Sequence, residues 1–357
     1  MHEILVVKVN SVVPHPNADS LDLVSVDGFD YNIISRRGQF KVGDLGVYVE
    51  PDYVVLTEVE DFAFLDKTKS SIRITNKRLR GLWSDGLLIP AKPHHVLGQN
   101  VMEEYKITRW EPPTRNNRGF GNEGSDMQTG WQAPGPEVIA PKYDLENFKK
   151  YSSLINGEDI VYYTVKIHGC NARFVYSNGQ MYCGSRTTWK YKPGTVIERI
   201  NTKTGEKIET IAPDNSWWIA LNQNPWLEEW CRNNPDSVVY GEVFGSDIQG
   251  HKFHYGYQSG NLGIRIFDVL ENSKWVSFHE LKTNSKYDNL NLVPVIYFGN
   301  HDKELLYTLI EENENAITCG ENHIREGVVI KLVKERTDFK IGRVALKCVG
   351  RKYLERS

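Results

Sequence analysis

The sequence predicts an α+β protein, with a small N-terminal β-barrel followed by a larger domain of strands and helices. Three observations support this fold class. Residues 1–105 hold short strand-like segments and no long helical period. Residues 106–150 are rich in proline and glycine, and from residue 151 onward strand-like runs alternate with helical patterns. We therefore expect three parts: a barrel over 1–105, a linker over 106–150 and a domain over 151–357.

The first part has the pattern of short strands separated by turns that is typical of a small β-barrel. β-branched and apolar residues fill 4–9, 21–26 and 45–49, and turn-forming pairs such as Asp27-Gly28 and Gly43-Asp44 separate such runs. The linker contains Pro112-Pro113, Arg118-Gly119-Phe120-Gly121 and Pro134-Gly135-Pro136 and offers little apolar surface to bury. We expect it to be only partly ordered against its neighbours.

The third part begins with a hairpin signal, because Asn178-Gly179 lies between the β runs 172–176 and 181–183. Helices are expected near 215–233 and 302–315, the second with Asp302 as its N-cap and with Leu305, Leu306, Leu309 and Ile310 on one face. The runs 328–330 and 344–346 are expected to be buried strands.

Composition places the chain among globular proteins that do not enter membranes. The 357 residues are 40% hydrophobic and 25% charged. No apolar run has membrane-spanning length, and Met1-His2-Glu3 lacks a signal-peptide pattern, so we expect a cytoplasmic protein without a membrane partner. The five cysteines show neither zinc spacing nor a disulfide framework, and His251-x-x-His254 lacks a third ligand nearby.

Basic residues gather in two stretches although the net charge is −3. The segment 331–357 carries nine Lys and Arg residues against three acids. A second run contains Arg186, Lys190, Lys192, Arg199, Lys203 and Lys207. This clustering of basic residues is typical of proteins that bind a partner bearing phosphates. An ordinary solvated face with surface lysines would explain the charges equally well.

Lys166 is the most informative residue. It ends the β-rich run 160–165, and Gly169 follows in a turn that would let a small ligand approach the backbone. Partial burial near other cations would lower the pKa of such a lysine and make it a nucleophile. The ordinary alternative is a solvated surface lysine.

Four further segments follow Lys166 in order. They are Ser185-Arg186-Thr187, the run 240–245 with Glu242, the run 266–269 with Phe267, and the C-terminal pair of runs 325–331 and 345–348, which contain Glu326, Lys331 and Lys347. This order resembles the covalent nucleotidyltransferase superfamily of ATP-dependent ligases and mRNA capping enzymes, over roughly residues 160–350. Lys166-x-His168-Gly169-x-Asn171 is similar to RNA ligases that seal nicks with 3′-OH and 5′-phosphate ends, whereas DNA ligases and capping enzymes usually carry Asp at the position of His168.

The order of the domains sharpens the resemblance. Only ten residues follow Lys347, whereas DNA ligases and capping enzymes place an OB barrel after their last motif. The barrel-like part lies in front instead, as in the RNA ligase branch with an N-terminal OB domain, and residues 14–21 resemble the opening of tRNA-binding-type OB domains. The resemblance implies an OB-type barrel and a nucleotidyltransferase domain with ATP-grasp-like antiparallel sheets and flanking helices.

The resemblance also implies the cofactors and a role for each residue. ATP would be attacked by Lys166 to leave AMP covalently bound there, with Mg²⁺ or Mn²⁺ held by Glu326 and Glu242. Catalysis would depend on Lys166, Glu326 and Lys347. Nucleotide contacts would come from Lys331 and Lys347 at the α-phosphate, Phe267 on adenine, Glu242 and Asn171 at ribose or phosphate, Arg186 at a terminal phosphate or ribose, and His168 in the loop.

Two departures from the family pattern stand out. Val349 occupies the place of a second lysine in the last motif, and Arg343, Arg351 or Lys352 is the candidate replacement. Val165 stands where relatives often have a polar residue. The expected partner is a nicked RNA or RNA/DNA hybrid duplex, bound by a monomer. The alternatives are a capping-type guanylyltransferase, a DNA ligase, or a non-catalytic RNA-binding protein whose OB domain does the binding.

Overall fold

The computed structural model describes residues 3–66, 68–110, 132–200, 205–246, 248, 254–314 and 323–355. The chain divides into two compact units. The first comprises Met1–Pro113 and Asn147–Ile155, and the second comprises Thr114–Glu146 and Asn156–Ser357. Some residues named above lie outside the described ranges: Pro112-Pro113, Arg118-Gly119-Phe120-Gly121, Lys203 and His251.

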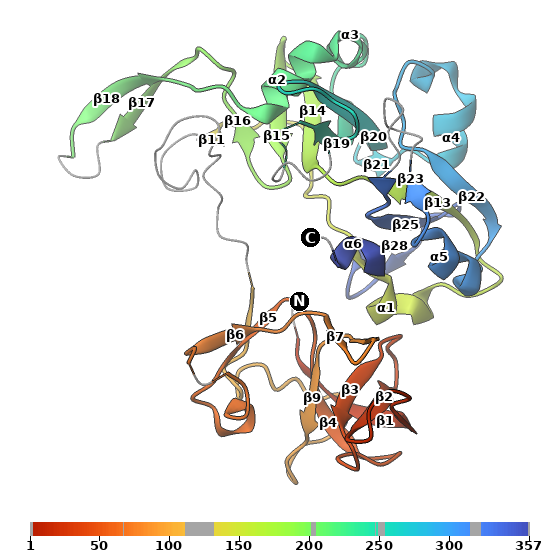
Figure 1. The fold of residues 1–357 in the computed structure, drawn as a ribbon. Coiled ribbons are helices and arrows are strands. Elements are labelled where there is room, and N and C mark those ends of the chain that lie inside the picture. Colours follow the sequence, from red (N-terminus) through yellow and green to blue (C-terminus); the bar gives the residue numbers. More distant parts are fainter. Residues whose placement is uncertain are drawn as a thin grey trace. The chain divides into compact units, whose positions relative to one another are not determined.

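Short antiparallel strands form the N-terminal barrel, as predicted (Figure 1). A five-stranded sheet has the order β3 (Ile33–Arg36), β2 (Leu21–Val26), β1 (Leu5–Pro14), β4 (Leu45–Val49), β9 (Leu87–Pro90). A second sheet joins β10 (Thr108–Arg109), β5 (Tyr53–Leu56) and β6 (Ser71–Arg73), and β7 (Lys77–Leu79) pairs with β8 (Leu82–Ser84). A 3₁₀ turn, η1, covers Glu60–Phe62. Burial alternates along β2, so every second side chain enters the core.

Two hydrogen bonds bring the barrel close to closure. The backbone N–H of Ile34 in β3 donates to Oγ of Ser84 at 2.9 Å, and the N–H of Asp85 donates to the carbonyl of Asn32 at 2.7 Å. Together they join the first sheet's outer strand β3 to the segment that leads into β9, its other outer strand. Polar backbone at the sheet edge is thereby satisfied, which is how small barrels protect their edges.

The segment Asn147–Ile155 packs with the barrel rather than with the residues that follow it. It contains α1 (Phe148–Tyr151) and a 3₁₀ turn, η2 (Ser152–Leu154), and the Phe148 side chain is fully buried. Nζ of Lys150 lies 2.6 Å from Oε1 of Glu50, and Nζ of Lys149 lies 3.5 Å from Oδ2 of Asp85. The N-terminal unit is therefore built from two separate stretches of sequence, unlike the continuous part predicted.

Two antiparallel sheets make up most of the second unit (Figure 1). The seven-stranded sheet has the order β11 (Gln132–Ala133), β16 (Trp189–Lys190), β15 (Gln180–Ser185), β14 (Cys170–Ser177), β19 (Val238–Gly245), β20 (Leu262–Glu271), β21 (Lys274–Trp275). The five-stranded sheet has the order β12 (Glu146–Asn147), β28 (Ala345–Val349), β25 (Gly327–Leu332), β13 (Ile160–Lys166), β22 (Val295–Asn300). Three ribbons pair β17 (Val196–Ile200) with β18 (Lys207–Ile211), β23 (Asn313–Glu314) with β24 (His323–Ile324), and β26 (Thr337–Asp338) with β27 (Gly342–Arg343).

The predicted hairpin at Asn178-Gly179 is confirmed. Strands β14 and β15 pair from Ala172–Ser185 to Ser177–Gln180, and both turn residues have positive φ, 48° and 80°. This is the conformation that made Asn-Gly a hairpin signal. The predicted strands at 328–330 and 344–346 correspond to β25 and β28, and β28 begins at Ala345.

The helices are shorter than predicted. The helix expected near 215–233 is two helices, α2 (Ser216–Gln223) and α3 (Pro225–Asn233), because Pro225 cannot continue the first and begins the second. Asp302 caps α5 (Lys303–Leu309) as predicted, but this helix ends where the guanidinium of Arg325 donates to the Leu309 carbonyl. The others are α4 (Phe278–Thr283), η3 (Ser285–Tyr287) and α6 (Arg351–Leu354). None of the helices in the described part of the chain has the length and apolar character to cross a membrane.

The described end of the predicted linker contributes to a core. Val138, Ala140, Tyr143 and Leu145 pack against buried residues of β19 and β20, including Tyr240 and Leu270. The expectation that this stretch has little to bury is therefore wrong for residues 138–145. Composition misled here because a few apolar residues among prolines and glycines are enough to fix a short strap against a sheet.

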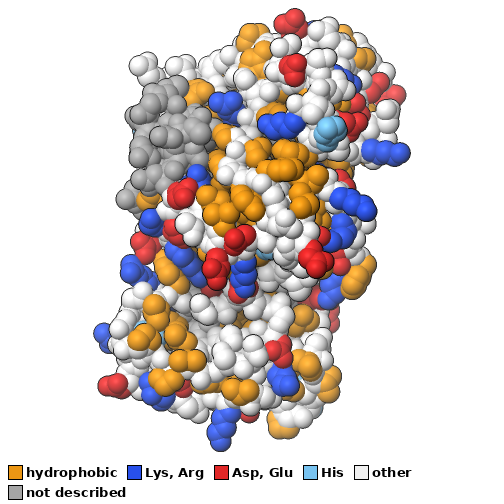
Figure 2. All heavy atoms as spheres, turned by 90° about the vertical axis from the view of Figure 1, so that its right-hand side faces the viewer, with side chains coloured by type: hydrophobic (Ala, Val, Ile, Leu, Met, Phe, Trp, Pro, Cys, Tyr) orange, Lys and Arg blue, Asp and Glu red, His pale blue; other side chains and the backbone are white. Residues whose placement is uncertain are grey.

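Charges of both signs are interspersed on the face drawn in Figure 2, together with scattered hydrophobic side chains. That distribution matches the nearly balanced composition of the chain. Net charge therefore says little about the partner, and the charges that matter must be found locally.

Candidate active site

A pocket of about 440 Å³ opens in the second unit, between residues of its two sheets. The five-stranded sheet contributes residues of β13, β25 and β28, and the seven-stranded sheet contributes residues of β14, β15, β19 and β20. The polar and charged lining residues are Asp144, Thr164, Lys166, Asn171, Ser185, Arg186, Thr187, Glu242, Lys331 and Lys347. Seven of the nine predicted site residues thus line one pocket, while His168 and Glu326 lie beside it.

Lys166 and Glu326 are neighbours because of strand register. Lys166 is the last residue of β13 and stands opposite Gly327, the first residue of β25, so Glu326 comes directly before that strand. The Nζ atom of Lys166 lies 2.7 Å from Oε1 of Glu326, and the two side chains are 22% and 12% exposed. A partly buried ion pair of this kind fixes the amine at the edge of the pocket.

Glu242 adds a second carboxylate near Lys166. It lies in β19 opposite Asn171 of β14. Burial raises the pKa of Glu242 to about 8, with Lys166 opposing that shift and the negative charge of Glu326 adding to it. Two acids and one amine therefore share a small, poorly solvated volume.

The carboxylates decide the protonation of Lys166. Burial disfavours the ammonium, but the charges of Glu326 and Glu242 outweigh burial, so the pKa of Lys166 lies above its ordinary value. The predicted lowering of this pKa depended on cations beside the amine, a divalent ion among them, whereas the charged side chains that act on Lys166 here are acids.

Two buried oxygens at this place have no hydrogen-bond partner among the described residues, Oε2 of Glu326 and Oδ1 of Asn171. An unsatisfied buried carboxylate oxygen is costly, and a hard cation is a common way to satisfy it. The donor set of carboxylate and amide oxygens therefore fits Mg²⁺ or Mn²⁺, with Glu326 and Glu242 as the residues that would hold it.

Gly169 has no room for a side chain. A Cβ atom there would lie 2.3 Å from the Val243 carbonyl oxygen and 2.8 Å from Cγ of Glu242. The close approach predicted at this glycine is therefore made by strand β19 itself. Glycine lets the turn after Lys166 lie against the strand that carries Glu242.

His168 ties the same turn to two tyrosines. Its backbone N–H donates to the hydroxyl of Tyr255 at 2.7 Å, and its Nδ1 atom lies 2.5 Å from the hydroxyl of Tyr353 in α6. His168 thus holds the loop from outside the pocket lining, which agrees with an orienting role.

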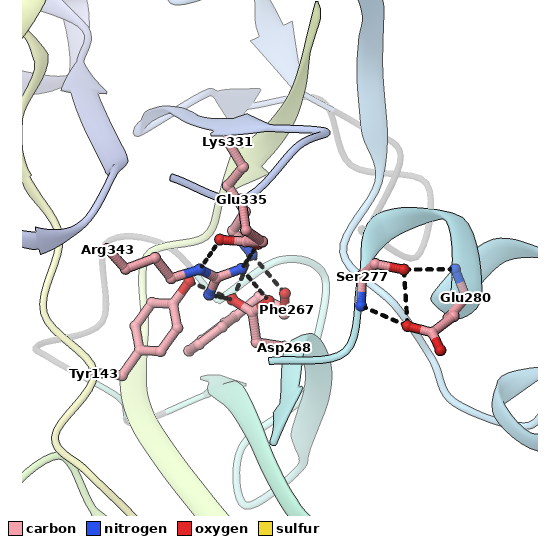
Figure 3. Close-up of polar contacts among 8 residues, drawn as sticks. All are labelled: Tyr143, Phe267, Asp268, Ser277, Glu280, Lys331, Glu335 and Arg343. Carbon is pink, nitrogen blue, oxygen red and sulfur yellow. Dashed lines mark hydrogen bonds and ion pairs between the residues drawn. The ribbon is translucent and has the colours of Figure 1, made fainter. Parts of the chain in front are cut away.

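Lys331 lies at the centre of a buried polar network (Figure 3). Its side chain is 1% exposed, and Nζ is 2.6 Å from both Oδ2 of Asp268 and the carbonyl oxygen of Phe267. Burial lowers the pKa of Lys331, with Arg343 adding to this and Asp268 opposing it. An ammonium has three N–H donors, so these two contacts leave one for the pocket.

Arg343 completes that network. Nη1 lies 2.9 Å from Oδ2 of Asp268, Nη2 lies 3.1 Å from Oδ1, and Nε donates to Glu335 at 2.8 Å. The hydroxyl of Tyr143 donates to the same aspartate (Figure 3). Burial disfavours the Asp268 carboxylate, but the two cations reverse this and hold its pKa below the ordinary value.

Phe267 and Arg186 complete the wall of the pocket. The half-buried Phe267 ring lies 4.6 Å from the ring of Tyr143, so two aromatic rings stand side by side in the lining. Nη1 of Arg186 is 2.8 Å from Oδ1 of Asp144, and both side chains are more than half exposed. An exposed pair of this kind is weak and readily exchanged for another anion.

A comparison with protein-family models shows which family has this fold and pocket. A family model described as RNA ligase matches residues 159–349, which is more than half of the chain. The chain belongs to the RNA ligase family. A second model, described as an OB-fold domain, matches residues 4–91 of this ligase. A search of curated proteins finds no match.

Solved structures of the Naegleria gruberi RNA ligase share the fold of this ligase. A mutant in the apo state has a TM-score of 0.74 at 21% identity, covering 99% of this chain and 98% of that one. Mutants with AMP and Mn and with ATP and Mn have TM-scores of 0.73 and 0.72 at 21% identity, each covering 100% of this chain and 99% of that one. The OB-type barrel followed by a ligase domain is thus the architecture of both proteins.

The sequence interpretation of this RNA ligase missed two residues of the buried network around Lys331. Asp268 lies next to Phe267, and an acid inside an otherwise apolar run is the signal that it is buried and paired. Tyr143 lies in the predicted linker, where no local pattern marks it. Of the three candidates for the missing second cation, Arg343 shares Asp268 with Lys331, while the backbone N–H groups of Arg351 and Lys352 donate to Glu311.

Proposed function

We propose that this RNA ligase joins a 3′-OH end to a 5′-phosphate end of nicked RNA, using ATP and a covalent lysyl-AMP at Lys166. The proposal rests on one observation above all: the Lys166 amine stands at a pocket that also presents Glu242, Phe267, Lys331 and Lys347. A nucleophile, an aromatic wall and cations for phosphate are the groups that nucleotidyl transfer requires.

The first step forms the covalent intermediate. The Nζ atom of Lys166 attacks the α-phosphorus of ATP, a P–N bond forms, the bond to the pyrophosphate oxygen breaks, and the amine loses its proton. Lys347 and the remaining N–H of Lys331 stabilise the charge on the α-phosphate, and Phe267 stacks on adenine. Asn171 contacts ribose or phosphate.

Two further steps complete sealing. An oxygen of the RNA 5′-phosphate attacks the adenylate phosphorus, a phosphoanhydride forms, and the bond to Lys166 breaks. The 3′-OH then attacks the activated 5′-phosphorus, a phosphodiester forms and AMP leaves. Arg186 holds a phosphate of the RNA at the rim, in exchange for its weak pair with Asp144. The OB-type unit holds the RNA, and the ligase acts as a monomer.

A divalent cation fits the site on chemical grounds. Glu326 and Glu242 would hold it, since Oε2 of Glu326 is buried and unsatisfied. Once bound, the ion would neutralise the two carboxylates that now raise the pKa of Lys166. Glu326 otherwise positions the amine by direct contact at 2.7 Å.

The decisive experiment is labelling with ATP that carries the label on its α-phosphate, in the presence of Mg²⁺ or Mn²⁺. The wild type becomes labelled, and mass spectrometry places the adenylate on Lys166. Lys166→Ala abolishes the label, whereas Lys106→Ala, which removes an exposed lysine of the other unit, keeps it. Label in Lys166→Ala, or transfer from GTP in place of ATP, overturns the proposal. Nicks with RNA or DNA at each end then define the substrate.

A further inference from the structure

The basic run that begins at Arg186 leads away from the rim of the pocket. Ser185, Arg186 and Thr187 line the pocket, and the chain then enters β16, where Trp189 pairs with Gly184 and Lys190 pairs with Cys183. Lys190 therefore lies in the outer part of the seven-stranded sheet, and Lys192 follows just after the end of β16. The proposed function uses Arg186 but neither of these lysines.

Both lysines lie over tryptophan rings of the adjacent helix α2. The Nζ atom of Lys190 is 5.1 Å from the ring centroid of Trp217, which itself lines the pocket. The Nζ atom of Lys192 is 5.7 Å from the ring centroid of Trp218. A cation within about 6 Å of an aromatic face is attracted to it, so the two ammonium groups are held in place rather than left to move freely.

Hydrogen bonds fix the backbone of the same segment to α2. Nε1 of Trp218 donates to the carbonyl of Lys190 at 3.0 Å, and Nδ2 of Asn215, the N-cap of α2, donates to the carbonyl of Tyr191 at 3.2 Å. Nε1 of Trp217 donates to the carbonyl of Asn171, a residue of the pocket. These bonds join the segment around β16 to the start of α2, and the two elements lie side by side in Figure 1.

We propose that Lys190 and Lys192 bind the RNA strand that carries the 5′-phosphate and present that phosphate to the pocket. This inference rests on the proposed function. A terminal phosphate carries about −1.5 to −2 charges at neutral pH, more than a phosphodiester, so a rim with several fixed cations favours the phosphorylated end.

The proposal concerns the second step of ligation. An oxygen of the bound 5′-phosphate attacks the phosphorus of lysyl-AMP, a P–O bond forms, and the P–N bond to Lys166 breaks to return the amine. Lys190 and Lys192 position the attacking phosphate and take no part in the bond changes. The alternative is that the two aliphatic stems only cover the tryptophan rings, as lysines often do on protein surfaces.

The test uses the full chain and a double variant, Lys190→Gln with Lys192→Gln. The matched control is Lys274→Gln with Lys282→Gln, which removes the same charge from two exposed lysines outside the basic run, one on β21 and one in α4. Three quantities are measured: labelling by ATP, transfer of AMP to a nick with a 5′-phosphate, and the affinity for that nicked RNA at several salt concentrations.

We expect the rim variant to be labelled within about twofold of the wild type, and its AMP transfer to fall about 10- to 100-fold. Its RNA affinity should fall as well, and the slope of log affinity against log salt should become shallower by roughly 1 to 2, because each lost phosphate contact contributes about 0.7 to 0.9. Lys190→Arg with Lys192→Arg keeps the charge and should restore transfer. The control double variant should behave like the wild type.

Three outcomes overturn the assignment. Equal transfer and equal salt slope in the rim variant and the control mean that the lysines only cover the rings. Loss of ATP labelling in the rim variant means that they serve the triphosphate of ATP. Failure of the arginine variant to restore transfer in a folded protein means that charge is not what matters. If the wild type itself takes no label, the proposed function fails, and the RNA affinity still reports on the rim.

Discussion

Nζ of Lys166 lies 2.7 Å from Oε1 of Glu326, and the two residues are 160 positions apart in the chain. The contact follows from the pairing of β13 with β25, which sets Lys166 opposite Gly327. The same carboxylate group has a second, buried oxygen without a hydrogen-bond partner in the described part of the chain. Glu326 therefore has two proposed functions to separate: one oxygen holds the amine, and the other would bind a cation.

Glu326→Gln should separate these two functions. Loss of the negative charge lowers the pKa of Lys166, because Glu326 is one of the two carboxylates that raise it. Lys166 should then react faster with an amine-selective reagent at pH 8 when no divalent ion is present. Labelling by ATP should nevertheless fall by about 100-fold, the order of magnitude for loss of one charge-stabilising group.

The two readouts are measured on the same protein, by mass spectrometry of modified Lys166 and by label transfer. Glu58→Gln is the control, since Glu58 is an exposed acid that pairs with Lys106 in the other unit. Slower amine modification in Glu326→Gln would contradict the assignment of Glu326 as the main cause of the raised pKa.

Gly169→Ala should reduce labelling by ATP, because the added methyl group displaces the turn that follows Lys166. The new methyl group would meet the Val243 carbonyl at 2.3 Å, so the turn after Lys166 must move away from β19. Overpacking of this kind costs about 1–3 kcal/mol. Since a displacement of about 1 Å can reduce catalysis about 100-fold, ATP labelling should fall by at least tenfold. Gly157→Ala is the matched control, because its nearest neighbour would be 3.9 Å away, and it should keep full labelling.

Asp268→Asn should be strongly destabilising. It would leave the buried Lys331 and Arg343 without their shared counter-ion. Removing one partner of a buried ion pair costs about 3–5 kcal/mol, and the urea midpoint of the ligase unit should fall accordingly. Asp144→Asn breaks the exposed pair with Arg186 and should cost less than about 1 kcal/mol. Similar midpoints for the two variants would show that the network in Figure 3 contributes little to stability.

Local sequence signals predicted the parts of the fold that local physics determines. Asn178-Gly179 specified its hairpin because both residues tolerate positive φ, and Asp302 specified a helix start because its side chain accepts from Leu305. Lys166, Glu242 and Lys347 were found because each lies within a recognisable motif on a strand. The fold then brings these three residues together as lining residues of one pocket.

What the sequence interpretation missed depends on contacts between distant residues. Tyr143 reaches Asp268 across 125 positions, and nothing in the proline-rich stretch around it indicates that partner. The Leu309 carbonyl at the end of α5 accepts from Arg325, which lies between β24 and β25, 16 positions away. The two carboxylates that raise the pKa of Lys166 could not be identified from motif charges, because strand register determines which charges are adjacent.

A last prediction concerns Asp159, where the pH dependence has a definite sign. Arg336 binds Asp159 through two bonds of 3.0 Å each, and this contact lowers the pKa of Asp159 below 3.8, its ordinary value, with burial opposing it. A carboxyl whose pKa is depressed on folding stabilises the protein fully above the unfolded pKa. That stability is lost as the pH falls through the folded pKa.

Asp159→Asn keeps the shape of the side chain and removes its charge. Because Arg336 is 42% exposed, solvent screens the pair, and we expect the variant to lose about 1 kcal/mol at pH 7. The difference from the wild type should stay constant down to about pH 5 and shrink below about pH 4. Urea midpoints at pH 7, 5, 4 and 3 measure it, and Arg336→Gln should show the same loss at pH 7. A difference that persists undiminished at pH 3 would mean that the variant is weakened by the loss of one hydrogen-bond acceptor, because the amide NH2 cannot accept from Arg336 or Asn156, and not by the loss of charge.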